Sequence, residues 1–540
     1  MLYAGRVRST LLVALGFAAT TCSAPPTESE PRRDVVEPAP PLEGGSRSEI
    51  DIAMLRDLTA ELASDSYEGR GTGTPGGRRA TELIASQMQA RGLVAAVGGF
   101  AQPLQLQGST LGRVSLRRTD GRHASELTGF IAQSESPSGP HAWSREVVFV
   151  GYGIDTEPGW DDYAGIDVTD KIVVALVGEP DASPFRDRAL SPAGRWTSKL
   201  ERARAHGAAG CLVVHTADAG YDWSVVQTSF SGERFELVPM PPAQLALRGW
   251  LSSESFEPLT GLSLRAAQRE ASKPGGATRS LAQSLEVSFE QTTRELEEHN
   301  VVGTVGSGAA PFVVVTAHWD HLGRVPSPVP PEDPIFNGAV DNATGVASML
   351  ALASAVAGRH REDPLAGTVY FVATAAEEQG LLGSRAFVVD LPVPVESVAA
   401  AVNLDGMNVQ DATPSVELVA AGHSTLDALF GSALARQGRI AVPDRAPQSG
   451  AAYRSDHVPF LRLGIPILYP TPGFAGSAAL VRAGQERAAR YHAVSDDFDP
   501  AWSFEGAAAD TQAIYEVVID IADGKVRPRM LPTGPGLPTP

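Results

Sequence analysis

From about residue 300 onward, short apolar runs alternate with stretches of helical periodicity. The runs continuous enough to be buried strands lie at 312–315, 369–373, 398–402 and 465–468, and the first helical stretch lies at 346–357. Strands that are apolar at every position are typical of a parallel sheet with helices on both faces. The pattern therefore predicts an α/β fold around a mostly parallel, doubly wound sheet.

The two ends of the chain differ from this pattern. Residues 1–24 have a cationic start, an apolar stretch at 11–19 and a small-residue exit, which together predict an export signal. If the signal is that of a lipoprotein, Cys22 is the candidate for a lipid anchor. Residues 25–48 predict a disordered linker, and 526–540 predict a disordered tail. We expect an exported protein that is secreted, periplasmic or lipid-anchored at the cell envelope.

Charge and composition exclude several classes of function. The 540 residues include 44 Lys and Arg against 63 Asp and Glu, a formal charge of −19, so we expect no nucleic-acid partner. The two cysteines exclude a disulfide scaffold and a thiolate zinc site, which leaves His and carboxylate groups to hold any metal. The apolar stretch near the N-terminus is shorter than the roughly 20 residues of a membrane-spanning helix, so no transmembrane span is expected.

Side chains that can bind metals follow directly after three of the predicted strands. His318 comes after the first strand, Glu377 and Glu378 after the second, and Asp405 after the third. Ligands of open α/β sheets bind beyond the carboxyl ends of the strands, where these residues are expected to meet. Taken singly, each residue has an ordinary explanation as a turn former, a helix cap or a solvated first turn.

Two further residues extend the set. Asp341 lies at the start of the predicted crossover helix, and His492 lies near the end of the chain. Three carboxylates and two imidazoles, with Glu377 to spare, suit two divalent ions that share a bridging carboxylate.

The segments around these residues resemble the co-catalytic dizinc aminopeptidase family, of the secreted bacterial leucine aminopeptidase type. Their order and spacing agree with the family over about 300–520. The segments that carry the resemblance are 68–76, 317–323, 337–345, 377–384, 403–405, 455–460 and 491–492.

The resemblance implies a zinc-exopeptidase fold, two Zn²⁺ ions and a set of site residues. Asp341 is expected to bridge the ions, Glu377 to be the general base, and Tyr491 to steady the oxyanion. The peptide substrate is expected to have a free N-terminus. The implied metal ligands are His318, Asp341, Glu378, Asp405 and His492.

Other residues receive lesser roles. Asp320 is expected to orient the imidazole of His318, and Asp456 is a candidate for an outer contact or for the substrate amine. His321 and His457 are interpreted as structural.

The resemblance also suggests how the chain is divided. Residues 49–110 and 291–525 are expected to form the peptidase domain, and 111–290 resemble the protease-associated domain inserted in many relatives. Strand-like runs at 172–177 and 212–214 with a helix near 199–205 agree with a β-rich insertion. It is expected either to gate substrate or to stabilise the fold.

Alternative functions remain open at this point. A carboxypeptidase needs cations for the terminal carboxylate, and Arg385, Arg454 and Arg462 lie near the motifs. A glutaminyl cyclase of this fold uses a single zinc ion. A non-catalytic receptor would have lost ligands, and none is lost here. The sequence indicates neither the preferred side chain at the scissile bond nor an oligomeric state.

Overall fold

The computed structural model describes residues 49–531 apart from 97, 156–158, 183, 186–190, 241–243 and 326–331. The predicted export signal, Cys22, the linker 25–48 and the last part of the tail lie outside the described residues. The helices are α1 (Ile52–Leu62), α2 (Pro75–Ala90), α3 (Trp196–Ala205), α4 (Trp223–Ser229), α5 (Ser253–Thr260), α6 (Leu264–Glu270), α7 (Thr344–Glu362), α8 (Leu382–Val389), α9 (Leu426–Arg436), α10 (His457–Arg462), α11 (Ala478–Arg490) and α12 (Glu505–Ala522).

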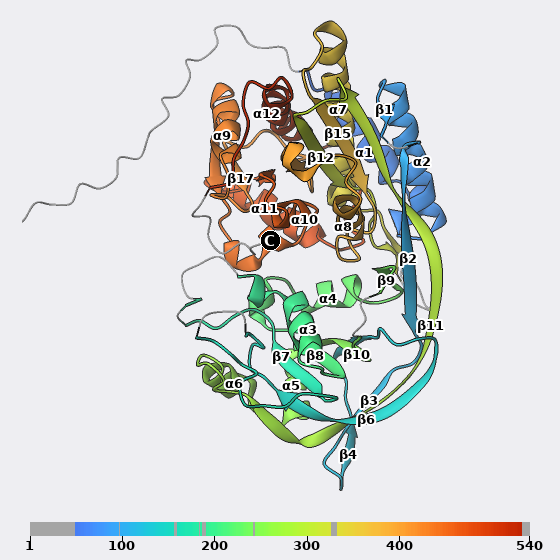
Figure 1. The fold of residues 1–540 in the computed structure, drawn as a ribbon, viewed down its shortest axis with the longest axis vertical. Helices are drawn as coiled ribbons and strands as arrows, with labels where there is room; N and C mark the ends of the chain where they lie inside the picture. Colours follow the sequence, from blue (N-terminus) through green and yellow to red (C-terminus); the bar gives the residue numbers. More distant parts are fainter. Residues whose placement is uncertain are drawn as a thin grey trace, which may run out of the picture. The chain divides into compact units, whose positions relative to one another are not determined.

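The strands form one extended sheet with two smaller pairings beside it (Figure 1). The strands are β1 (Val94–Ala95), β2 (Ala101–Leu111), β3 (Ser115–Thr119), β4 (Ala124–Glu126), β5 (Phe130–Gln133), β6 (Gly139–Phe149), β7 (Ile172–Leu176), β8 (Gly210–Val214), β9 (Arg234–Leu237), β10 (Leu247–Leu251), β11 (Arg279–Gly306), β12 (Phe312–His318), β13 (Gly323–Arg324), β14 (Ile335–Phe336), β15 (Thr368–Thr374), β16 (Val398–Asn403), β17 (Ser415–Leu418), β18 (Ile440–Pro443), β19 (Ile467–Leu468) and β20 (Pro470–Pro472).

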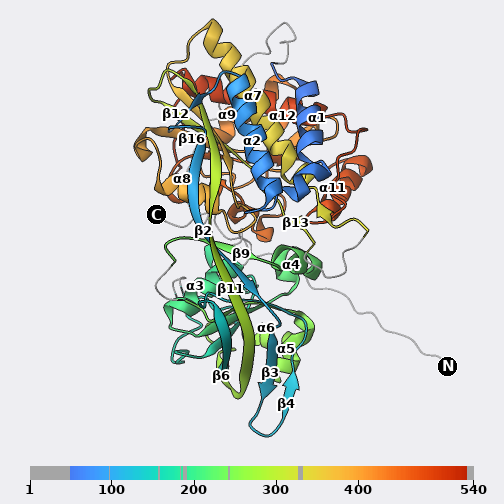
Figure 2. The ribbon, with the colours of Figure 1, turned by 90° about the vertical axis from the view of Figure 1, so that its right-hand side faces the viewer.

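Two runs of parallel strands are joined by one long antiparallel strand. The order β19-β16-β12-β15 is parallel throughout, and so is β6-β7-β8-β10. Between them β11 pairs antiparallel with β15 near its C-terminal end and with β6 near its N-terminal end. Figure 2 shows β11 and β2 running together from one region into the other. The predicted domain boundary at 290 therefore falls inside a continuous strand.

Alternate side chains of the parallel strands pack into two different cores, one on each face of the sheet. In β12, Val313 and Val315 pack with helices α1, α2, α7, α9 and α12, whereas Phe312 and Val314 pack with α8 and α10 on the other face. Successive side chains of a strand point to opposite faces, so a strand that is apolar throughout must be covered on both. The predicted α/β fold with a doubly wound sheet is confirmed.

Helix α7 is apolar on nearly all sides because it lies inside the molecule. The stretch Ala339–Glu362 is long and apolar enough to cross a membrane, but 89% of its most apolar window is buried in the chain. A helix that is apolar all round and packed against others is typical of a core position. It corresponds to the crossover helix predicted at 346–357.

The first residues of the predicted disordered tail are ordered in the structure. Residues 526–531 follow α12 and are hydrogen-bonded to the segment before α9, through Thr425 N–H to Arg529 O at 3.0 Å and Leu531 N–H to His423 O at 2.7 Å. The proline content suggested disorder, but proline is also compatible with an extended strand-like segment at a sheet edge. The prediction of disorder is wrong for these six positions.

Candidate metal centre

The candidate ligands lie where the sheet topology places them. His318 is the last residue of β12, while Glu378 and Asp405 follow the ends of β15 and β16. These three strands are parallel neighbours, so their carboxyl ends meet at one edge of the sheet. Asp341 precedes α7 and His492 follows α11, and both reach the same edge.

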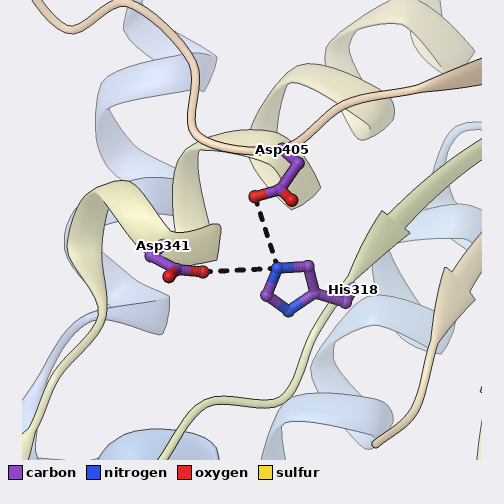
Figure 3. Close-up of side chains that lie close together, drawn as sticks. All are labelled: His318, Asp341 and Asp405. Atoms are coloured by element: carbon purple, nitrogen blue, oxygen red, sulfur yellow. Dashed lines mark ion pairs between the residues drawn. The ribbon is translucent and has the colours of Figure 1, made fainter. Parts of the chain in front are cut away.

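One half of the centre is formed by His318, Asp341 and Asp405 (Figure 3). Nε2 of His318 lies 3.3 Å from Oδ1 of Asp341 and 3.4 Å from Oδ1 of Asp405. Nδ1 of the same ring donates to the backbone carbonyl of Asp320 at 3.1 Å. Nδ1 therefore carries a proton, and Nε2, which faces the two carboxylates, is the nitrogen that a metal ion would bind.

The other half uses the second oxygen of the same aspartate. Nε2 of His492 lies 3.4 Å from Oδ2 of Asp341 and 3.2 Å from Oε2 of Glu378. The two oxygens of Asp341 thus face two different imidazoles. A carboxylate in this position can contribute one oxygen to each of two cations.

The donor spacing fits metal coordination. Two ligands of a tetrahedral ion, each about 2.0–2.1 Å from the metal, lie about 3.3–3.4 Å apart. The separations of 3.2–3.4 Å match that edge length. Imidazole nitrogens and carboxylate oxygens are the donors that Zn²⁺ and similar ions take when thiolates are lacking. The residues present therefore fit two divalent ions.

His321, interpreted from the sequence as structural, belongs to the site. Its Nδ1 donates to Oε1 of Glu378 at 2.8 Å, and its side chain is fully buried. This separation is that of a hydrogen bond and is shorter than the spacing between ligands of one ion. His321 therefore holds one oxygen of Glu378 and leaves the other facing His492.

Asp320 acts differently from the prediction. Its backbone carbonyl, not its carboxylate, receives the bond from His318. The carboxylate instead accepts the amide N–H groups of Glu377 at 2.9 Å and of Glu378 at 3.3 Å. The difference arises because the loop after β15 lies closer to this carboxylate than the imidazole does. Asp320 thus fixes the loop that bears both glutamates.

Sequence reasoning missed the residue that holds the bridging aspartate. The Asp496 carboxylate accepts the amide N–H groups of Val340 at 3.1 Å and of Asp341 at 3.0 Å. Its only sequence signal was its place in the acidic segment just after His492. A buried carboxylate on two backbone amides orients the turn that presents Asp341.

A residue of the inserted region touches the centre directly. The Ser229 hydroxyl at the end of α4 lies 2.6 Å from Nδ1 of His492. With a metal ion on Nε2, Nδ1 would carry the proton and would donate it to the hydroxyl oxygen. Arg234 in β9 donates to the backbone carbonyls of Ser229 at 2.7 Å and of Glu378 at 3.2 Å. Nothing in the sequence marked these residues.

Residues 300–515 match the sequence model of peptidase family M28. We refer to this matched stretch as the M28 domain. The M28 domain contains all five implied ligands, and the predicted resemblance and the prediction of a metallopeptidase are confirmed.

The similarity in fold to a solved structure extends beyond residues 300–515. The chain is similar to an aminopeptidase from Aneurinibacillus sp. strain AM-1, with 18% identity, a TM-score of 0.56, and coverage of 91% of this chain and 97% of that chain. A zinc aminopeptidase from Bacillus subtilis matches at 18% identity and a TM-score of 0.47, covering 87% of this chain and 96% of its own. No curated protein matches the chain.

The pKa values of the two adjacent glutamates of the M28 domain are shifted in opposite directions. Burial raises the pKa of Glu377 well above its usual range, and the neighbouring charge of Glu378 acts in the same direction. Burial would also raise the pKa of Glu378, but His492 and the hydrogen bond from His321 outweigh it and lower the pKa to about 2. Glu378 is therefore the better ligand and Glu377 the better proton acceptor.

A cavity of about 370 Å³ adjoins the M28 metal centre. Glu377, Glu378, Tyr491 and His492 line it on one side, and residues of the inserted region, including Ser229, line the other. The Tyr491 ring stacks on His492 with centroids 3.9 Å apart and is 41% exposed. Its predicted role in binding an oxyanion stays a prediction.

Proposed function

We propose that the chain is an aminopeptidase that uses two zinc ions to hydrolyse the first peptide bond of peptides with a free N-terminus. The observation that carries this proposal is the bridging position of Asp341, whose two oxygens face His318 and His492. The Aneurinibacillus protein of similar fold is an aminopeptidase, and we extend that activity to this chain.

Five side chains would hold the two ions. When bound, zinc ions polarise the substrate carbonyl and lower the pKa of water, which makes hydrolysis possible at neutral pH. The bridging Asp341 would belong to both ions, each of which has two further ligands. The first pair is His318 and Asp405, and the second is Glu378 and His492.

Glu377 would carry the proton. It lines the cavity beside the ligands, and its raised pKa makes it a stronger base than an ordinary glutamate. It would accept the proton of the attacking water and deliver it to the leaving amine. The Tyr491 hydroxyl would donate to the oxygen that becomes negative as the carbonyl is attacked.

A carboxypeptidase is the second candidate, because the cavity supplies the cations that this activity needs. Arg385, Arg454 and Arg462 all line it. A glutaminyl cyclase or a non-catalytic receptor is less well supported, because the full set of ligands for two ions is present.

We further propose that the protein is exported by residues 1–24, with lipid attachment at Cys22 if that signal is of the lipoprotein type. The region 111–290 would be a protease-associated domain. Mass spectrometry tests the proposal of export. After expression in a bacterium with an intact export pathway, it identifies the first residue of the mature protein.

Peptides with free and blocked ends test the activity. The chain should release N-terminal residues from a panel of aminoacyl substrates, lose activity with a chelator and regain it with zinc. N-acetylated peptides should be inert. Cleavage of acetylated peptides at their C-terminus would replace the aminopeptidase with the carboxypeptidase.

A further inference from the structure

Several arginines line the cavity beside the metal centre, although the protein as a whole has a net charge of −19. Arg195 comes from the turn before α3 in the inserted region. In the M28 domain, Arg454 precedes α10 and Arg462 is the last residue of that helix. None of these three arginines forms an ion pair with a carboxylate in the described part of the chain. They therefore present unneutralised positive charge toward the space that a substrate would occupy.

Two other arginines of the cavity, Arg204 and Arg248, are already neutralised by carboxylates. Glu135 pairs with Arg248 at 2.8 Å and also with Arg204. Arg248 reaches Glu236 at 2.7 Å as well. These ion pairs use up the carboxylates on that wall of the cavity, so they do not offset the charge of the three unpaired arginines.

The three arginines lie close enough to influence one another. Burial lowers the pKa of Arg195 to about 10, and the charge of Arg462 acts in the same direction, followed by that of Arg454. Glu201 opposes this effect but makes no ion pair with Arg195 in the described residues. Gathering like charges in a partly desolvated space costs free energy unless an anion joins them.

Aromatic rings hold two of the guanidinium groups in place. Arg195 lies over the ring of Tyr453 at 5.4 Å, and Arg454 lies over that of Tyr221 at 4.7 Å. Arg454 also donates to the backbone carbonyls of Ala219 at 2.9 Å and of Ser449. Arg462 is exposed, and no residue in the described part of the chain restrains it in this way. Groups held before a ligand arrives lose less conformational entropy when they bind it.

We propose that this cluster, Arg195, Arg454 and Arg462, binds a carboxylate of the substrate on the side of the scissile bond that leaves. The inference rests on the proposed function, which places the reacting carbonyl at the ligands and the rest of the peptide in the cavity. Guanidinium groups bind carboxylates through paired, charged hydrogen bonds. The enzyme thus selects short peptides by their C-terminal carboxylate, or peptides with an acidic residue beyond the cleaved bond.

Two pairs of peptides distinguish these two sources of the carboxylate. The first pair is a tripeptide of sequence Xaa-Gly-Gly as free acid and as C-terminal amide. The second is Xaa-Glu-Gly amide against Xaa-Gln-Gly amide, where Xaa is the best residue of the aminoacyl panel. The carboxylate member of at least one pair should have a kcat/KM about tenfold higher or more, which is the effect of one charged hydrogen bond.

Arginine variants connect this preference to the cluster. In zinc-loaded full-length protein, Arg195→Gln and Arg462→Gln should bring the ratio within each preferred pair close to one. Arg482→Gln, at an exposed arginine of α11 outside the cavity, should leave it unchanged. Arg454 is not substituted because its backbone contacts also support the fold. Equal kcat/KM values for acid and amide in both pairs would overturn the proposal and leave the aminopeptidase intact.

A binding measurement keeps the two proposals separate. Calorimetric titration of the same peptides into zinc-loaded Glu377→Gln protein should show about tenfold tighter binding of the acid, and the double variant with Arg462→Gln should lose the difference. If the acid binds more tightly than the amide but the wild type hydrolyses none of the peptides, only the proposal of an aminopeptidase is contradicted. Equal binding of acid and amide, or no binding of either, would overturn the carboxylate site.

Discussion

Glu377 and Glu378 are neighbours in the sequence, but their carboxylates lie in different surroundings. His321 and His492 contact Glu378, and they lower its pKa despite burial. Glu377 has no such imidazole contact, and burial raises its pKa. Two identical side chains are thereby divided into a carboxylate that stays ionised and one that holds a proton more readily than an ordinary glutamate.

We predict that Glu377→Gln retains both metal ions and loses about 10²–10⁴ in kcat, the usual contribution of a general acid–base group. Metal content by atomic emission and turnover of an aminoacyl substrate are the measurements. Glu378→Gln, one residue further on, is the matched control and should lose metal as well as activity. Turnover close to wild type in Glu377→Gln would rule out its assigned role.

Lys199 in α3 is a buried cation away from the metal centre. It is fully buried, its Nζ donates to Ala193 O at 2.7 Å, and burial lowers its pKa from 10.5 to about 7. Because the unfolded chain holds this proton up to a higher pH than the folded chain, stability should rise as pH increases from 7 to 10.5. Below pH 7 the full cost of the buried charge remains.

We expect Lys199→Met to be more stable than the wild type at pH 7, with the gap closing by about 1.4 kcal/mol per pH unit as the pH rises. Urea unfolding midpoints at pH 7, 8 and 9 measure this. Lys273→Met, at an exposed position of the same region, removes the same charge and should show no such trend. A gap that does not vary with pH would mean that Lys199 stays charged in the folded chain up to pH 9, so that burial does not lower its pKa as expected.

At the scale of elements, α4 and β9 bring the inserted region onto the metal ligands. Ser229 bonds to His492, Arg234 bonds to the carbonyl of Glu378, and the Phe235 N–H reaches Gln379 at 3.4 Å. A ligand imidazole is oriented by the partner of its other nitrogen. The inserted region therefore contributes to the geometry of the centre, beyond the roles of gate or stabilising appendage.

We predict that Ser229→Ala weakens zinc binding about 10–100-fold, the usual cost of removing a hydrogen-bond partner of a ligand. Competition with a chromophoric chelator measures the affinity independently of activity. Ser229→Thr, which keeps a hydroxyl, should restore most of it, and Ser224→Ala on the exposed side of the same helix should have no effect. Wild-type affinity in Ser229→Ala would show that the bond does not orient His492.

At the scale of the molecule, the fold gathers carboxylates that repel one another. Asp341, Asp405 and the adjacent pair Glu377 and Glu378 come from three separate segments and meet at one sheet edge, where two cations would neutralise them. Binding to the folded chain alone stabilises it, because the unfolded chain does not bring these residues together.

Removal of metal should therefore lower the Tm of the whole chain. Zinc at about 1,000 times its Kd adds about 4 kcal/mol to the free energy of unfolding. Calorimetry of the protein treated with chelator and then reloaded with zinc is the measurement, with Asp341→Ala as a control whose Tm should not respond to zinc. Equal Tm values for treated and reloaded wild type would contradict a metal centre formed by these residues.

The sequence by itself determined the features that depend on near neighbours along the chain. Apolar runs place β12, β15 and β16, because a strand buried on both faces must be apolar at each position, and helical spacing places α7. The rule that parallel strands end at one edge then predicted that His318, Glu378 and Asp405 lie together. Asp341 and His492 joined this set through the family resemblance.

Only the tertiary structure decided which side chains face one another across long separations. The contacts of Ser229 with His492 and of Asp496 with the amide of Asp341, and the gathering of Arg195 with Arg462, have no local signature. Such contacts depend on how loops and the inserted region pack, and packing is set by the shape of the whole chain rather than by periodicity within one segment.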